Sequence, residues 1–103
     1  MKKTLVLCKG RHITPASDFM FDDISDIIFD CNAKEKIIHE KLQDCKELHL
    51  YVTGATPVLI DVINYCVYNM IDTTLYHYNR DTNKYVFQKL VVSNKISVYC
   101  DCQ

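Results

Sequence analysis

A short polar segment in the middle of the chain, Thr53-Gly54-Ala55-Thr56, has the composition of a ligand-binding turn. Its threonine hydroxyls and backbone amides can donate hydrogen bonds to an anion, and its glycine lets a ligand approach the backbone closely. The segment therefore predicts contacts with an anion or with the edge of a nucleotide. Glycine and threonine also occur at such turns for backbone geometry alone, so a purely geometric role stays open. The turn is neither a Walker A loop nor a GxGxxG fingerprint.

A second polar segment, from Gly10 to Thr14, follows an apolar run near the start of the chain. Arg11 and His12 in this segment are candidate anion contacts, although solvated loop residues would have the same composition. Together with residues near the end of a later strand, the two segments make up the expected ligand-binding set. It consists of Gly10, Arg11, His12, Thr14, Thr53, Gly54, Ala55, Thr56, His77, Tyr78 and Arg80.

Catalysis without a metal is the second chemistry that these residues could perform. Cleavage of an RNA-type phosphodiester through its 2′-hydroxyl needs positioning, charge stabilisation and a general base. His12, His77 and Tyr78, with Arg80 beside them, are the candidates for that work. A histidine in a strand is more often a core residue than a base, so no definite catalytic residue is assigned.

The acidic and sulfur-containing residues do not predict a metal site or a cofactor. Five aspartates lie between residues 18 and 30, but the segment lacks the glycine and the closing glutamate of a calcium loop. The six cysteines include no Cys-x-x-Cys pair. Cys8, Cys45 and Cys66 lie in or beside apolar segments, where thiols pack as small hydrophobes. The close pair Cys100 and Cys102 is poorly spaced for zinc, and a disulfide there stays open.

The elements that would position the central turn are a strand and a helix. Leu48 to Val52 is a short run of branched and aromatic residues, which is typical of a buried strand. Thr56 is a suitable N-cap and Pro57 a suitable first helical residue. The apolar residues that follow recur with helical spacing as far as Met70, at positions 59, 62, 63, 66, 67 and 70.

The remaining pattern predicts an α/β fold with a small Rossmann-like sheet, parallel core strands and a C-terminal antiparallel hairpin. The expected strands are 3–8, a short one at 27–29, the hairpin of 73–79 and 84–92, and a last one at 96–100. Asn32 is the expected cap of a helix from Ala33 to about Cys45, with Glu35 completing a capping box.

Length and charge limit the class of protein. A chain of 103 residues is one domain, covering 1–103, and its formal net charge of −1 gives no reason to expect binding to duplex nucleic acid. No apolar stretch reaches transmembrane length, and the apolar start is too short for a signal peptide. We therefore expect a cytoplasmic protein without a membrane partner.

A strand ending in a Thr-Gly-x-Thr-Pro turn, then an apolar helix and a strand with Tyr-x-Tyr, resembles the Rossmann-like nucleotide-sensing domains of prokaryotic defence systems. The most similar are the CRISPR-associated CARF family and the related SAVED domains. The resemblance involves Thr53, Gly54, Thr56 and Pro57, and extends to Gly10–Thr14. It implies binding of a cyclic oligonucleotide by a stand-alone sensor, by a phage-encoded protein that sequesters the signal, or by a ring nuclease that degrades it.

Exposed aromatic residues on the hairpin predict association of the chain with itself. Tyr76, Tyr78, Tyr85 and Phe87 are more than one small sheet can easily hide, and tyrosine is enriched at interfaces. A homodimer or larger homo-oligomer with the hairpin near the shared surface is therefore expected. Packing of these rings on the helix 58–70 that precedes the hairpin, within a complete monomer, is the alternative. A plain assembly protein without a ligand is the third functional hypothesis.

Overall fold

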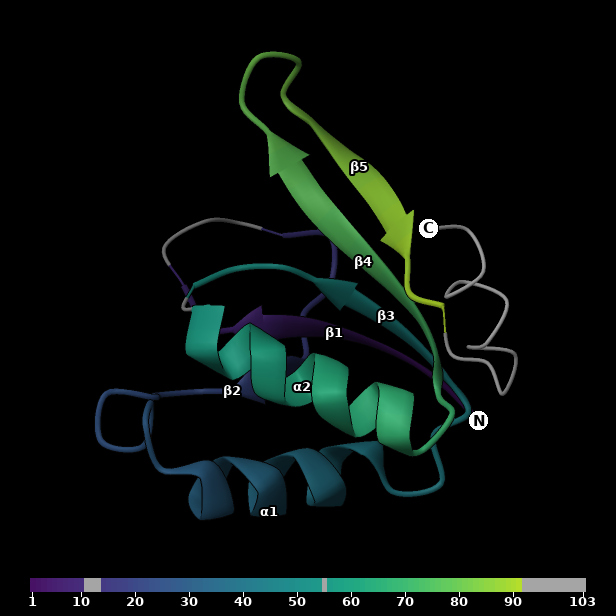
Figure 1. Ribbon diagram of the computed structural model, residues 1–103. Helices are drawn as coiled ribbons and strands as arrows, with labels where there is room; N and C mark the ends of the chain where they lie inside the picture. Colours follow the sequence, from purple (N-terminus) through teal and green to yellow (C-terminus); the bar gives the residue numbers. More distant parts are fainter. Residues whose placement is uncertain (11–13, 55, 92–103) are drawn as a thin grey trace, which may run out of the picture.

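The computed structural model describes residues 1–10, 14–54 and 56–91. Its strands form one sheet in the order β2-β1-β3-β4-β5, with β4 and β5 antiparallel and the other neighbours parallel. This arrangement confirms the α/β fold with parallel core strands and a C-terminal hairpin (Figure 1). In chain order the elements are β1 (Lys2–Cys8), β2 (Phe19–Phe21), α1 (Cys31–Leu42), β3 (Glu47–Tyr51), α2 (Thr56–Tyr68), β4 (Asp72–Asn79) and β5 (Lys84–Lys89).

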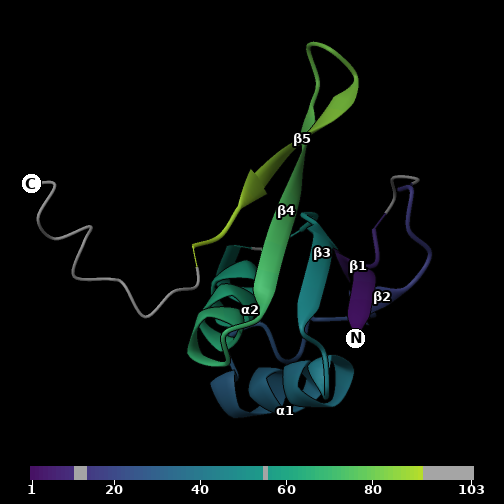
Figure 2. The same cartoon turned by 90° about the vertical axis from the view of Figure 1, so that its right-hand side faces the viewer.

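Both helices lie against the same face of the sheet, so the fold has two layers (Figure 2). The connections through α1 and α2 both move the chain in the same direction along the sheet, and right-handed crossovers in one direction place their helices on one side. Strand β3 shows the result: Leu48 and Leu50 are fully buried under the helices, whereas His49 and Tyr51 on the other side are only half-buried. We call this other side the open face.

The helix α2 supplies one half of the core. It buries Val58, Val62 and Cys66, and it ends at Tyr68 rather than at the predicted Met70, whose φ of 56° is left-handed. The helix begins at Thr56, which was predicted as its N-cap, one residue before the predicted first helical residue Pro57. Within the described part of the chain, neither helix has the length and apolarity needed to cross a membrane.

The start of α1 differs from the sequence prediction. Asp30, not Asn32, is the N-cap, and its carboxylate accepts a hydrogen bond from the Ala33 amide at 3.1 Å. Residues 27–29, predicted as a strand, form turns instead, with Ile27 N–H bonded to the Ile24 carbonyl at 3.0 Å. The strand in this region is β2, because phenylalanines at its two ends pair beside β1.

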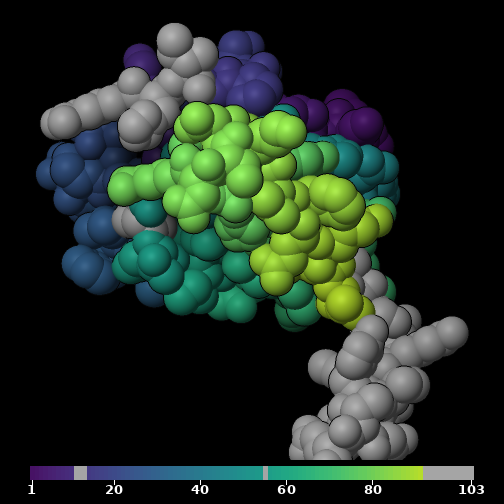
Figure 3. All heavy atoms as spheres, turned by 90° about the horizontal axis from the view of Figure 1, so that it is seen from above, coloured from purple at the N-terminus to yellow at the C-terminus, as the bar shows by residue number. Residues whose placement is uncertain are grey.

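The β4–β5 hairpin agrees with the prediction and projects beyond the two-layer body (Figure 1). Seen from above, its green atoms stand over the middle of the molecule (Figure 3). At its turn the Asn79 side chain accepts from the Asp81 amide at 2.9 Å, and Asn83 has a φ of 57°, which asparagine tolerates. The predicted strand at 96–100, and with it Cys100 and Cys102, lies outside the described residues.

Three cysteines are buried in the core, as predicted: Cys8, Cys45 and Cys66. Burial raises the pKa of the Cys66 thiol above its ordinary value of 9.0, more than a hydrogen bond with the Thr73 side chain lowers it. The neutral thiol is therefore the form that the folded core accommodates.

This shift predicts how stability changes at alkaline pH. Because the pKa of Cys66 is higher in the folded than in the unfolded chain, its contribution is complete below pH 9.0 and is lost as pH rises above that value. The difference in unfolding free energy between the wild type and Cys66→Ala should therefore narrow above pH 9. Urea denaturation of both proteins at neutral and alkaline pH measures this difference. A difference in unfolding free energy that stays constant with pH would contradict the prediction. Titration of the tyrosines does not disturb this comparison, because both proteins contain the same tyrosines.

Candidate functional site

A cavity of about 570 Å³ lies where β3 and β4 end and the hairpin begins. We call it the strand-end pocket. The carboxyl ends of parallel strands, next to the point where the chain changes direction along the sheet, are where open α/β sheets bind ligands. In this sheet that point lies between β1 and β3, because the chain moves from β1 outward to β2 and then back to β3, so the pocket is one strand away from it, at the carboxyl ends of β3 and β4. The pocket is lined by Val52, Thr53, Gly54, His77, Tyr78, Arg80 and Tyr85.

Hydrogen bonds connect one wall of the strand-end pocket to β1. The Thr53 hydroxyl donates to the Cys8 carbonyl at 2.7 Å and accepts from the Cys8 amide at 3.1 Å, so it joins the ends of β1 and β3. Gly54 follows with a φ of 85°, and an added Cβ there would meet the Cys8 Cβ at 3.2 Å. The glycine is therefore required both by its backbone angle and by its close approach to β1. The Thr53 hydroxyl is engaged within the protein.

The opposite wall comes from the hairpin. Arg80 is exposed and lines the pocket, so its guanidinium supplies a positive charge on this side. The Tyr78 hydroxyl donates to Asn83 Oδ1 at 2.8 Å, which holds the ring across the turn. His77 Nε2 lies 3.0 Å from Gln88 Oε1; since that oxygen can only accept, a neutral His77 carries its proton on Nε2 and keeps a lone pair on Nδ1.

Aromatic rings continue from the pocket across the open face. Tyr78 contacts Tyr85 at a centroid distance of 5.4 Å, and Tyr85 contacts Tyr51 edge-on at 4.9 Å. Tyr51 in turn stacks on Tyr76 at 4.7 Å. Burial raises the pKa of Tyr51, with smaller contributions from Tyr76 and Tyr85. These four tyrosines form the aromatic row, which offers flat, partly exposed surface beside a cationic pocket.

The structure brings together five of the residues that the sequence singled out: Thr53, Gly54, His77, Tyr78 and Arg80. Gly10, Thr14 and Thr56 do not line the pocket, and Thr14 instead donates to the Ala16 carbonyl at 2.9 Å. Residues 11, 12 and 55, that is Arg11, His12 and Ala55, lie outside the described part of the chain. Sequence reasoning missed Tyr85 as a pocket residue, although its pairing with Tyr78 in the hairpin would have placed it there.

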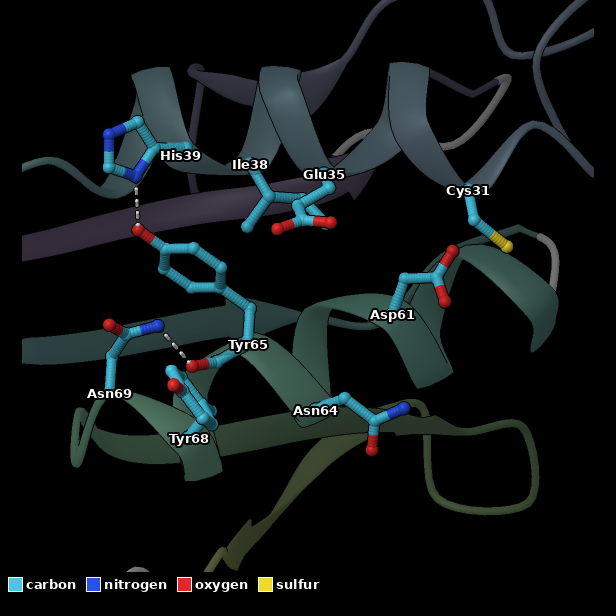
Figure 4. Close-up of a pocket in the computed structure, with 9 residues that line it drawn as sticks. All are labelled: Cys31, Glu35, Ile38, His39, Asp61, Asn64, Tyr65, Tyr68 and Asn69. Carbon is cyan, nitrogen blue, oxygen red and sulfur yellow. Dashed lines mark hydrogen bonds between the residues drawn. The ribbon is translucent and has the colours of Figure 1, made fainter.

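A second cavity, of about 580 Å³, lies between α1 and α2 (Figure 4). We call it the interhelical pocket. Its charged side chains are the carboxylates of Glu35 and Asp61, and Asp61 is paired with the buried ammonium of Lys34 at 2.5 Å. His39 Nδ1 meets the Tyr65 hydroxyl at 2.9 Å across the pocket. Its lining residues include neither lysine nor arginine, so it suits an anion less well than the strand-end pocket does.

Among residues 1–10, 14–54 and 56–91, no group of three or more His, Cys, Asp or Glu side chains is placed to hold a metal ion. Comparisons with protein-family models, with curated proteins and with solved structures find no match.

Proposed function

We propose that this protein binds a nucleotide-type signal, a cyclic oligonucleotide in particular, in the strand-end pocket. The observation that carries the proposal is the convergence of Arg80, Tyr78 and the Gly54 turn on one cavity of about 570 Å³. A guanidinium binds phosphate through a planar set of donors, and tyrosine rings stack on bases. Gly54 lines the same cavity, although the space that its missing side chain leaves is taken by Cys8 of β1. The volume is within the range of small-molecule sites.

The biological role that fits this site is that of a stand-alone sensor, or of a protein that sequesters the signal, in prokaryotic or phage defence. The resemblance to CARF and SAVED domains supports that role through the Thr53–Pro57 turn. We propose that the protein acts in the cytoplasm as a homodimer. Phe87 is 67% exposed and Val86 52%, so the edge strand β5 offers apolar surface to a second copy.

Replacing Arg80 by glutamine tests the site directly. We expect the variant to lose affinity for cyclic di-, tri- or tetranucleotides about ten- to a hundredfold, because a hydrogen-bonded charge contributes roughly 1.5–3 kcal/mol. Isothermal titration of the wild type identifies the ligand that binds, and titration of Arg80→Gln measures the loss. Lys84→Gln is the matched control, since Lys84 is an exposed cation of the same hairpin that does not line the pocket.

Equal affinity of wild type and Arg80→Gln would remove the strand-end pocket from the binding site. If no nucleotide binds or raises the melting temperature, the remaining hypothesis of a homo-oligomeric assembly protein is favoured. Light scattering examines the dimer separately. A mass of 12.0 kDa at micromolar concentration, unchanged by ligand, would contradict self-association.

A second candidate function is a metal-independent phosphodiesterase, a ring nuclease, acting on the same ligand. It is favoured by His77, which lines the pocket together with Arg80 and, as a neutral ring, keeps a lone pair on Nδ1 for a general base. Chromatography of the cyclic oligonucleotide after incubation separates the two functions. An intact ligand supports the binder, and a linear product that disappears in His77→Gln supports the nuclease.

A further inference from the structure

Three side chains on the open face form a hydrogen-bonded chain outside the strand-end pocket. Glu47 Oε2 lies 2.5 Å from His49 Nε2, and His49 Nδ1 lies 2.9 Å from the Tyr76 hydroxyl. Glu47 and His49 are two residues apart on β3 and share its open face, and Tyr76 is on the neighbouring strand β4. We call this set the relay. The imidazole is held at both nitrogens, so its orientation is fixed.

The direction of each hydrogen bond follows from the chemistry of the acceptors. The hydrogen bond from His49 is the largest cause that lowers the pKa of the Glu47 carboxyl, so Glu47 is a carboxylate and can only accept. His49 Nε2 must therefore carry a proton. In the neutral ring, Nδ1 is then a lone pair, and it accepts the phenolic proton of Tyr76. The relay thus has a hydroxyl, a base that receives its proton and a carboxylate that orients the base.

That order of groups is the arrangement of an activated nucleophile. A second His–Tyr pair in the protein lacks it. His39 Nδ1 meets the Tyr65 hydroxyl at the same distance of 2.9 Å, yet no carboxylate is hydrogen-bonded to His39 among the described contacts. The two pairs therefore differ in the residue that orients the base. This difference makes Tyr65 an internal control for Tyr76.

We propose that Tyr76 is a nucleophile for phosphodiesters, with His49 as its general base and Glu47 as the residue that positions His49. Tyr76 Oη attacks phosphorus, the new O–P bond forms as the bond to the leaving alcohol breaks, and the phenolic proton passes to His49 and then to the leaving oxygen. Water hydrolyses the resulting phosphotyrosine ester. His49 takes the proton of that water and returns it to Tyr76 Oη as the O–P bond breaks.

The position of the relay explains how a bound substrate could reach it. Tyr76 stacks on Tyr51, whose edge contacts the pocket residue Tyr85. An oligonucleotide that enters the strand-end pocket and extends along the aromatic row would therefore pass the Tyr76 hydroxyl. Lys2 and Lys89 are exposed on the same face, where Lys2 pairs with Glu47 at 3.9 Å and Lys89 with Asp72 at 3.7 Å, so a phosphate there would compete with these carboxylates for the two ammonium groups. The phosphodiester class rests on the proposed nucleotide ligand and belongs with the second candidate function, in which that ligand is cleaved, whereas the activation of Tyr76 depends only on the contacts of the relay.

Labelling with 4-toluenesulfonyl fluoride tests the activation without any nucleotide. Attack by a tyrosine oxygen on sulfur forms an S–O bond and expels fluoride, and peptide mapping by mass spectrometry locates the label. We expect Tyr76 to react on the order of a hundredfold faster than Tyr68, for which no histidine contact is seen in the described part of the chain, since that is the lower end of what general-base assistance contributes. Tyr76 should also react faster than Tyr65, whose base His39 has no carboxylate to orient it among the described contacts. Tyr68, 87% exposed, controls for exposure, because exposure alone would make it the most reactive of the three.

Variants of the relay separate activation from mere packing. Tyr76→Phe keeps the ring stacked on Tyr51 and should lose the label at that position. His49→Gln should remove the assistance to Tyr76 altogether, and Glu47→Gln should reduce labelling of Tyr76 towards the rate of Tyr65, with circular dichroism confirming the fold of each. If Tyr76 reacts no faster than Tyr65 in the wild type, the proposal fails whether or not the variants fold.

The substrate class has its own test. Wild type should release 4-nitrophenolate from bis(4-nitrophenyl) phosphate, and Tyr76→Phe should not. Release equal to that of Tyr76→Phe would overturn the phosphodiester assignment. Because neither probe is a nucleotide, these results are independent of whether Arg80→Gln weakens ligand binding, and the two proposals can fail separately.

Discussion

Lys34→Met should destabilise the fold by about 2 kcal/mol, less than the loss of one partner from a fully buried ion pair costs, because the Asp61 side chain is 25% exposed and lines the interhelical pocket. Lys34 is only 2% exposed, and its ammonium lies 2.5 Å from Asp61 Oδ2, so this pair connects α1 to α2. Without the lysine, the carboxylate of Asp61 remains between the helices with its countercharge gone. Urea denaturation, compared with wild type, measures the loss.

Two further variants show whether the pair is responsible. Lys36→Met removes an exposed cation from the same helix and should change stability by no more than about 0.5 kcal/mol. The double variant Lys34→Met with Asp61→Leu removes both charges and should recover much of the loss, because an apolar pair of similar volume needs no countercharge. A double variant that is less stable than Lys34→Met would show that the lysine acts through packing of its stem instead.

Gly54→Ala should destabilise the fold by about 2 kcal/mol, because a left-handed angle costs an L-residue roughly 1–2 kcal/mol and steric contact adds to it. The φ of Gly54 is 85°, and its new Cβ would lie 3.2 Å from the Cys8 Cβ and 3.3 Å from the Cys8 Sγ. The strained backbone at residue 54 lines the strand-end pocket, so the affinity for the nucleotide should also be lower in Gly54→Ala. Thermal unfolding and titration of one preparation measure both effects.

The other glycine of the chain provides the control. At Gly10 an added Cβ would meet only the Cys8 carbonyl oxygen, at 3.9 Å, so Gly10→Ala should be close to wild type. In a Cys8→Ala background the contact with sulfur is removed while the backbone strain remains, and the cost of Gly54→Ala should fall only in part. Equal costs at the two glycines would contradict the geometric account of the turn.

The sequence predicted the elements whose patterns are local. The apolar run of β3, the helical spacing of α2 and the turn residues of the hairpin led to the correct order of elements and to the parallel core. The region before α1 was mispredicted because its phenylalanines and isoleucines have no clear period. There, Phe19 and Phe21 gain their strand conformation from pairing with β1, which is a contact distant in sequence.

The site was predicted in part for the same reason. Thr53 and Gly54 follow the end of β3, and His77, Tyr78 and Arg80 lie in or just after the last residues of the neighbouring parallel strand β4, so topology brings them together. The open face was not foreseen, since it depends on both helices packing on one side. From the sequence, Glu47 and His49 were therefore interpreted as ordinary strand residues. Only their separation by two positions indicated that they share a face of the sheet. Their link to Tyr76 requires the register of β3 against β4.

The two halves of the strand-end pocket differ in rigidity, because one of them belongs to the hairpin that projects beyond the two-layer body. The half that contains Thr53 and Gly54 is bonded to β1 in the centre of the sheet. The half that contains Arg80 and Tyr85 belongs to a two-stranded ribbon whose outer strand is almost wholly exposed. Such a ribbon opens at a low free energy while the central strands stay protected from hydrogen exchange. The hairpin side of the pocket can thus move while the side next to β3 stays fixed. A ligand that contacts both sides would lower the amplitude of the hairpin motion.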